Sequence, residues 1–184
     1  DSSFTWQHFA ATVNKDLADV LGNFVNRVLK FAITRFGDEI PNIPNPALYG
    51  PPEIDNFGQI DIAIESYTTA LRERAFRFAA AELRRIWSLG NEYLTLAAPT
   101  TQLKFDQEAA AKTIYYAINL TYVFAFLSYP IIPNAAEKII KALGLPSDAV
   151  LWPTHKLWVT GKSAGSEKES IEKFHLLPPK QRFS

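Results

Sequence analysis

Three polar side chains recur along one edge of an N-terminal helical segment. Asn23, Arg27 and Lys30 are spaced four and three residues apart, beside an apolar stripe. At 100° per residue they face the same way and can act on one ligand. An asparagine amide can bond the edge of a nucleobase, and an arginine fork can bind phosphate or guanine. The pattern fits nucleic-acid recognition, although geometry alone favours an ordinary polar helix edge.

A second group of cations lies further along the chain. Residues 37–71 contain acidic side chains but no Lys or Arg, and arginines then follow closely. Arg74, Arg77 and Arg84 are the candidates for contacts with phosphate groups. The alternative is a solvated helix face in which these arginines form i, i+4 ion pairs with neighbouring acids.

Residues for catalysis or metal binding are scarce. The chain has no Cys, so disulfides, thiol catalysis and iron–sulfur clusters are impossible. Glu172 and His175 form a single ExxH pair, whereas a di-iron bundle needs two such pairs and further carboxylates. No glycine-rich phosphate loop is present. We therefore expect no catalytic residue, no metal site and no cofactor in this chain.

Length and composition indicate one globular domain. The chain has 184 residues, of which 47% are hydrophobic and 21% charged. Its net charge of +0 excludes a surface coated with positive charge, although a local basic face remains possible. We expect no DNA partner.

Hydrophobic periodicity predicts an all-α fold, an antiparallel bundle of about five helices. The predicted helices cover residues 5–36, 61–71, 73–97, 106–128 and 133–144. Asn14 is expected to cap a restart of the first helix, and Gly37 to follow its end. The prolines within residues 38–56 predict a loop, and residues 99–101 a break. Asp106 is expected to cap the fourth helix.

Residues 113–136 carry no formal charge and are long enough to span a bilayer. Pro130 and Pro133 interrupt this stretch, and no basic flank would set its orientation. We therefore expect a central helix buried on all sides, with membrane insertion as the alternative. Gly90 is expected to mark a close contact between helices, and Trp87 to lie in the core.

Three motifs together resemble a known family. Residues 14–27 (NKDLADVLGNFVNR) are similar to the pattern N-x-D-L-x-x-x-L-G-N-x-x-x-R. Residues 81–94 (AELRRIWSLGNEYL) contain an N-x-Y motif that Ala98 and Pro99 follow, and residues 129–133 (YPIIP) contain P-x-x-P. In order and spacing they resemble the anticodon-binding domain of methionyl-tRNA synthetases, a class I synthetase domain, over residues 4–152.

The resemblance implies a helical bundle that grips the anticodon loop of a methionine-specific tRNA. Asn23 and Arg27 stand where the family contacts anticodon bases, and Pro99 and Thr100 would shape the adjoining wall. The family has a stacking Trp where this chain has Thr100. Stacking contributes about 1–3 kcal/mol per base. A neighbouring aromatic residue could compensate, anticodon discrimination could be relaxed, or the domain could have another function.

The same resemblance shapes the expected domain organisation. Residues 1–152 would form the helical domain, and residues 153–184 an extended C-terminal tail rich in Gly, Ser, Pro and charge. The chain shows no HIGH-like or KMSKS-like signature, so ATP and methionine would bind a catalytic domain outside it. We expect protein biosynthesis in the cytoplasm, or in an organelle matrix. A repurposed bundle that serves as a protein-interaction or assembly module is the rival function.

Overall fold

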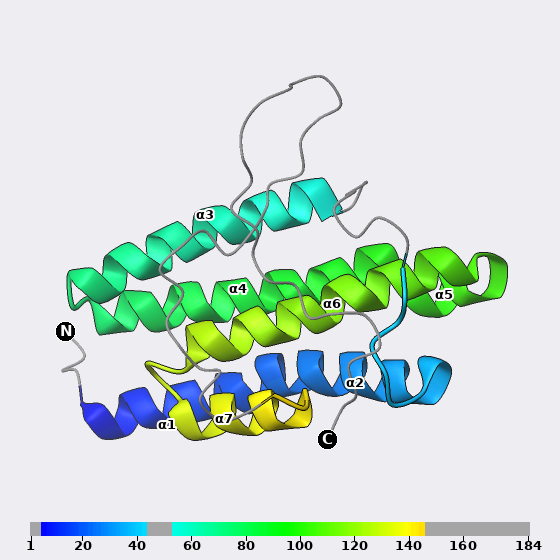
Figure 1. Ribbon diagram of the computed structural model, residues 1–184. Helices are drawn as coiled ribbons and strands as arrows, with labels where there is room; N and C mark the ends of the chain where they lie inside the picture. Colours follow the sequence, from blue (N-terminus) through cyan, green and yellow to red (C-terminus); the bar gives the residue numbers. More distant parts are fainter. Residues whose placement is uncertain (1–4, 44–52, 146–184) are drawn as a thin grey trace.

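The computed structural model describes residues 5–43 and 53–145, and these form an all-α bundle (Figure 1). Its elements are α1 (Trp6–Asp16), the π-helical turn η1 (Leu17–Gly22), α2 (Asn23–Phe36), α3 (Glu53–Arg72), α4 (Phe76–Ala97), α5 (Pro99–Phe105), α6 (Gln107–Ser128) and α7 (Pro133–Ala142). The first three elements join end to end into one rod. The predicted five long helices are therefore confirmed, with the short α5 added, and the described residues contain no β-strand.

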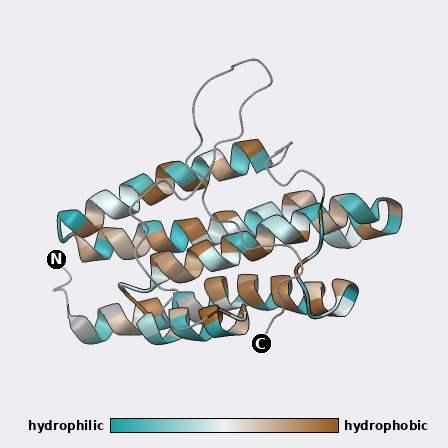
Figure 2. Cartoon of the chain, in the orientation of Figure 1, coloured by the Kyte–Doolittle hydropathy of each residue, from teal (hydrophilic) through white to brown (hydrophobic). Residues whose placement is uncertain are grey.

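The α6 helix occupies the centre of the bundle. It packs against α2, α4, α5 and α7, and its residues from Thr113 to Ser128 are buried apart from Tyr122. This burial confirms the predicted central helix and explains why its sequence is apolar all round. None of the described helices is long and apolar enough to cross a membrane. The outer helices α3 and α7 instead carry both hydrophilic and hydrophobic residues along their length (Figure 2).

Gly90 marks a close contact between helices, as predicted. A Cβ added there would lie 2.5 Å from the Phe124 ring of α6 and 3.1 Å from the Phe24 ring of α2. These two rings pack against each other at 5.0 Å between centroids. Trp87 lies in the core as expected, where its indole N–H donates to the Ser128 hydroxyl at 3.2 Å. The missing side chain at Gly90 therefore lets α4 approach both neighbouring helices.

The second long helix begins earlier than the sequence indicated. We predicted a start near residue 61, but α3 begins at Glu53, directly after two prolines. Proline is tolerated at a helix start, so it does not exclude a helix immediately after it. Glu53 is buried and accepts a hydrogen bond from the Tyr93 hydroxyl at 2.9 Å. Burial raises the pKa of Tyr93 well above its usual value, and the Glu53 charge raises it further.

Two predicted helix interruptions are misplaced. The helix does not restart at Asn14, because α1 runs through that residue and the irregularity comes later, in η1. Residues 99–101 are not a break, because Pro99 opens α5. The interruption between α4 and α5 lies one residue earlier, at Ala98, which adopts a left-handed conformation with φ 45°.

Other predicted boundaries are confirmed. Gly37 follows the end of α2 with φ 85°, a conformation that favours glycine. Asp106 caps α6 through its carboxylate, which accepts from the Ala109 N–H at 2.9 Å. The predicted domain boundary after residue 152, the tail and the Glu172–His175 pair lie outside the described residues.

Candidate nucleic-acid interface

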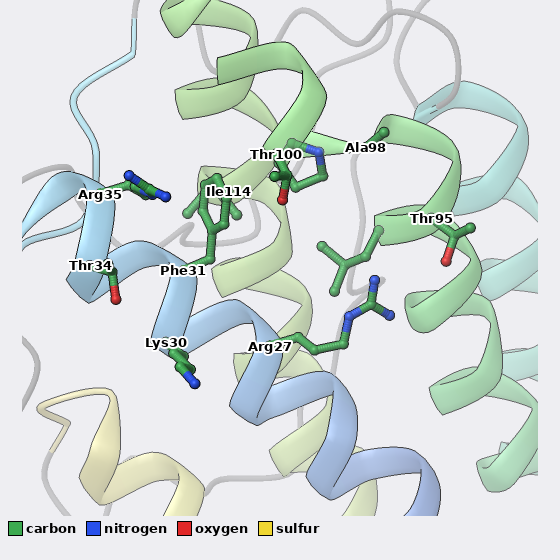
Figure 3. Close-up of a pocket in the computed structure, with 11 residues that line it drawn as sticks. Arg27, Lys30, Phe31, Thr34, Arg35, Thr95, Ala98, Thr100 and Ile114 are labelled. Atoms are coloured by element: carbon green, nitrogen blue, oxygen red, sulfur yellow. The ribbon is translucent and has the colours of Figure 1, made fainter. Parts of the chain in front are cut away.

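A pocket of about 530 Å³ opens between α2 and the junction of α4 with α5 (Figure 3). It is lined by Arg27, Lys30, Phe31, Thr34, Arg35, Leu94, Thr95, Ala98, Pro99, Thr100 and Ile114. Four of the five predicted RNA-binding residues are in this lining. One pair, Arg27 and Lys30, comes from α2, and the second pair, Pro99 and Thr100, comes from the start of α5. The left-handed turn at Ala98 brings the second pair opposite the first.

The charge of this pocket is positive. Arg27, Lys30 and Arg35 contribute cationic groups from α2, and the described lining includes no carboxylate. All three side chains are exposed, so a ligand can reach them. Clustered cations in a concave surface attract a polyanion, such as the backbone of a single-stranded nucleic acid.

Asn23 and Arg27 are joined by a residue that we did not predict as part of the site, Asn91 of α4. Its Oδ1 atom accepts from Asn23 Nδ2 at 3.2 Å and from Arg27 Nη1 at 3.4 Å. Its Nδ2 atom donates to the Val20 carbonyl at 3.0 Å and to the Trp87 carbonyl at 3.2 Å. These two donor contacts fix the orientation of the amide, so Oδ1 must face Asn23 and Arg27.

This bridge explains how the candidate pair is positioned. Asn23 is not in the pocket lining, but the shared acceptor ties it to Arg27 at the pocket edge. Asn23 keeps its own Oδ1 and a second N–H, and Arg27 keeps most of its five N–H groups, for a ligand. The N-x-Y motif in residues 81–94 contained the signal for Asn91. Its contact with α2 could not be predicted because 68 residues separate Asn91 from Asn23.

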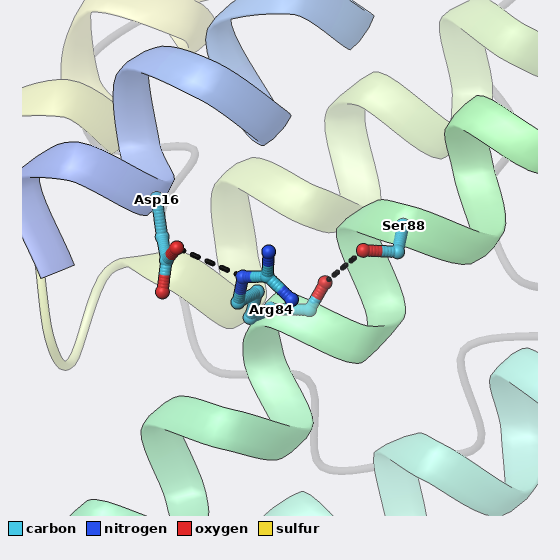
Figure 4. Close-up of polar contacts among 3 residues, drawn as sticks. All are labelled: Asp16, Arg84 and Ser88. Carbon is cyan, nitrogen blue, oxygen red and sulfur yellow. Dashed lines mark hydrogen bonds and ion pairs between the residues drawn. The ribbon is translucent and has the colours of Figure 1, made fainter. Parts of the chain in front are cut away.

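The three arginines predicted to contact phosphate lie elsewhere. Arg77 is near the start of α4, and the 1.5 Å rise per residue places it about 27 Å along the axis from Thr95. Arg74 lies in the turn that precedes α4, in a left-handed conformation with φ 58°. Arg84 forms an ion pair with Asp16 of α1, with 2.8 Å between Nε and Oδ1 (Figure 4). Arg74 and Arg77 therefore lie at the opposite end of α4 from the pocket, and Arg84 lies near its middle.

A second, smaller pocket occupies that end. Arg77, Arg84, His8 and Asp16 are among the residues that line its volume of about 220 Å³. It differs from the first pocket because a carboxylate lies among its cations. The described residues contain no group of three or more His, Asp or Glu side chains that could hold a metal ion.

Comparison with known proteins assigns the family. Residues 43–167 match the family described as the anticodon binding domain of methionyl tRNA ligase. The chain belongs to this family. Residues 1–29, which include Asn23 and Arg27, match a second family, the class I tRNA synthetases of the methionine type. The resemblance inferred from the three motifs is thereby confirmed.

Methionine–tRNA ligases are also the most informative relatives. The ligase of Streptomyces avermitilis is 46% identical over 154 residues, which are 84% of this chain and 26% of that protein. The ligase of Roseobacter denitrificans is 44% identical over 173 residues, 94% of this chain and 29% of that protein. The chain thus spans less than a third of the length of these relatives.

Solved structures show the same fold. The apo methionyl-tRNA synthetase of Mycobacterium tuberculosis has a TM-score of 0.71 at 19% identity, over 99% of this chain and 33% of that chain. The same enzyme in complex with methionyl-adenylate has a TM-score of 0.67 at 22% identity, over 80% and 30% of the two chains. The helical bundle described above is therefore the fold of a region of that enzyme.

Proposed function

We propose that this anticodon-binding domain holds the anticodon loop of a methionine-specific tRNA in the cationic pocket. The observation that carries the proposal is the Asn91 bridge, which presents Asn23 and Arg27 together at the edge of that pocket. The Asn23 amide and the Arg27 fork would bond the edges of unpaired bases. Anticodon bases are unpaired, so their hydrogen-bonding edges are accessible to side chains.

The remaining pocket residues would hold the backbone and shape the space. Lys30 and Arg35 carry positive charge next to Arg27 and suit phosphate groups. Pro99 and Thr100 would form the wall opposite α2. Phosphate contacts by Arg74 and Arg77 stay a prediction, and they require the RNA to extend along α4 beyond the pocket. The predicted contact by Arg84 would in addition have to compete with its ion pair to Asp16.

The activity of the parent protein follows from its family and is part of the proposal. ATP and methionine would bind a catalytic domain that these residues do not form, and that domain would be the protein partner of this one. The bundle itself would position the tRNA and take no part in the chemistry. We place this function in the cytoplasm, with an organelle matrix as the alternative.

Binding of tRNA at two ionic strengths tests the proposal. The full chain is titrated with methionine-specific tRNA and with the same tRNA carrying a different anticodon, at about 50 and 200 mM salt. Two phosphate contacts, by Lys30 and Arg35, predict a loss of affinity of about sevenfold between these conditions, from a slope of about −0.7 per contact. We expect the swapped anticodon to bind more weakly at both. Equal affinity for the two tRNAs would contradict the proposal.

One feature favours the rival function of a protein-interaction module. Ile62 of α3 and Phe78 of α4 are 63% and 52% exposed, and both line a pocket of about 300 Å³. Exposed apolar side chains around a shallow pocket suit a protein partner. Such binding would be nearly insensitive to salt, so the titration above separates the two functions.

A further inference from the structure

The cationic pocket contains an aromatic side chain that the proposed function has not used. Phe31 is the aromatic residue in the described lining, where Leu94 and Ile114 are aliphatic. In Figure 3 its side chain extends from α2 toward Ile114 and Thr100, into the space between the two walls. The residue is half-buried, because it packs against the core and lies next to the Phe36 ring without being fully covered.

Phe31 lies between cationic residues on the same helix. Arg27, Phe31 and Arg35 are spaced four residues apart, so each guanidinium-bearing residue is one turn, about 6 Å of helix rise, from the phenylalanine. All three line the same pocket. A ring flanked by cations is the usual arrangement for single-stranded nucleic acid, in which the base stacks while the cations hold the phosphates.

The opposite wall of the pocket carries no aromatic side chain among its described residues. Thr100 is exposed and small, and it offers no aromatic face to a ligand. The pocket volume of about 530 Å³ falls within the 300–1,000 Å³ range typical of ligand sites. A group the size of a nucleobase can therefore fit in the pocket that Phe31 lines.

We infer that Phe31 is the surface on which one unpaired anticodon-loop base stacks in this domain. The inference rests on the proposed function, because it names the contact that the pocket makes with the base itself. Arg27 and Asn23 bond the edge of a base, and Phe31 binds a face. The aromatic contact that Thr100 cannot make thus comes from the α2 side of the pocket.

Substitution of the ring tests this inference. The probe is the anticodon stem-loop of a methionine-specific tRNA with 2-aminopurine at one loop position in turn, because stacking quenches the fluorescence of this base. Phe31→Leu keeps an apolar side chain and removes the aromatic face, whereas Phe31→Trp keeps the face. Phe36→Leu is the matched control, since its ring lies 6.3 Å from that of Phe31 but is not in the pocket lining.

We expect Phe31→Leu to weaken binding about five- to fiftyfold and to abolish the quenching at one loop position. Phe31→Trp should retain both, and adding Thr100→Trp to Phe31→Leu should restore affinity. Phe36→Leu should bind as the wild type does. The thermal unfolding temperature of each variant is measured to check that the bundle is folded.

The outcomes separate the two proposals. If the wild type binds the stem-loop and Phe31→Leu leaves affinity and quenching unchanged, the inference is overturned and the proposed function stands. Equal losses in Phe31→Leu and Phe36→Leu also overturn it, because the effect would then come from packing. If the wild type fails to bind the stem-loop, both proposals are overturned.

Discussion

Cations gather beside two regions of α4, its α5 end and the half that packs near α1 (called the α1 end, residues 76–85), but their surroundings differ. At the α5 end, Arg27, Lys30 and Arg35 line a pocket with no carboxylate among its described residues. At the α1 end, Asp16 faces Arg84 across a 2.8 Å ion pair, and Glu82 pairs with Arg85 at 3.5 Å. The cations of the pocket thus have no acidic neighbour in its described lining, whereas Arg84 and Arg85 are each paired with an acid.

This difference shows that a run of arginines in the sequence does not determine which of them have an acidic partner. The i, i+3 partner Glu82 is visible in the sequence, but Asp16 lies 68 residues from Arg84. Whether a cation can serve a phosphate depends on such distant neighbours. The comparison therefore predicts that substitutions at the α5 end alter RNA binding strongly, and that matched substitutions at the α1 end do not.

Removing Arg27 should have the largest effect. Arg27→Ala deletes a fork that can bond a base edge, and each such contact contributes about 1–3 kcal/mol of discrimination. We expect tRNA affinity to fall about five- to 150-fold, and the preference for the methionine anticodon to be lost. Titration with the cognate and the anticodon-swapped tRNA measures both. Unchanged affinity and preference would show that the site lies elsewhere.

Gly90 sets how closely α4 packs against α2 and α6. Gly90→Ala places a methyl group 2.5 Å from the Phe124 ring, and overpacking of this kind costs about 1–3 kcal/mol. The helix propensity of alanine offsets up to about 1 kcal/mol. We expect the free energy of unfolding in urea to fall by about 1–2 kcal/mol. Because Asn91 is the next residue, tRNA affinity should also weaken.

Gly58 provides the control for this substitution. It lies inside α3, and a Cβ added there meets nothing within 4 Å. Gly58→Ala should therefore stabilise the chain by about 0.5–1 kcal/mol. Similar destabilisation by both variants would refute the close approach at Gly90.

Asn91 should influence binding without touching the RNA. Asn91→Ala removes the acceptor shared by Asn23 and Arg27, so both side chains lose their fixed orientation. We expect a five- to tenfold loss of tRNA affinity, about 1 kcal/mol, with a reduced anticodon preference. Ser88→Ala removes another polar side chain of α4, a hydroxyl that donates to the Arg84 carbonyl in the described contacts, and should leave affinity unchanged.

Lys30 should contribute charge and no base selectivity. Lys30→Gln removes one phosphate contact, so the slope of log affinity against log salt should fall by about 0.7 and affinity by a few-fold. Cognate and anticodon-swapped tRNA should lose affinity equally. A change in anticodon preference would instead assign Lys30 to the reading of bases.

Much of this molecule could be predicted from local sequence patterns. The buried α6, the core position of Trp87 and the Asp106 cap depend on neighbouring residues, and each prediction is confirmed. The start of α3 was missed because a long-range partner, Tyr93, stabilises Glu53 in the interior. The role of Asn91 was missed for the same reason. The sequence pattern of one segment cannot show which distant residues its polar side chains contact.

Arg84 should give the smallest effect and provides the sharpest test of the comparison. Exposed ion pairs contribute less than about 1 kcal/mol, so Arg84→Gln should change the free energy of unfolding little. Because the Asp16 carboxylate offsets the positive charge of Arg84, the substitution should alter tRNA affinity less than about twofold and leave the salt slope unchanged. Asp16→Asn breaks the pair and leaves Arg84 without this carboxylate. We therefore expect a small gain in affinity for any tRNA, and the gain should be larger at low salt. A loss of affinity in Arg84→Gln as large as that in Lys30→Gln would show that the RNA reaches the α1 end, and that a carboxylate neighbour does not prevent an arginine from binding phosphate.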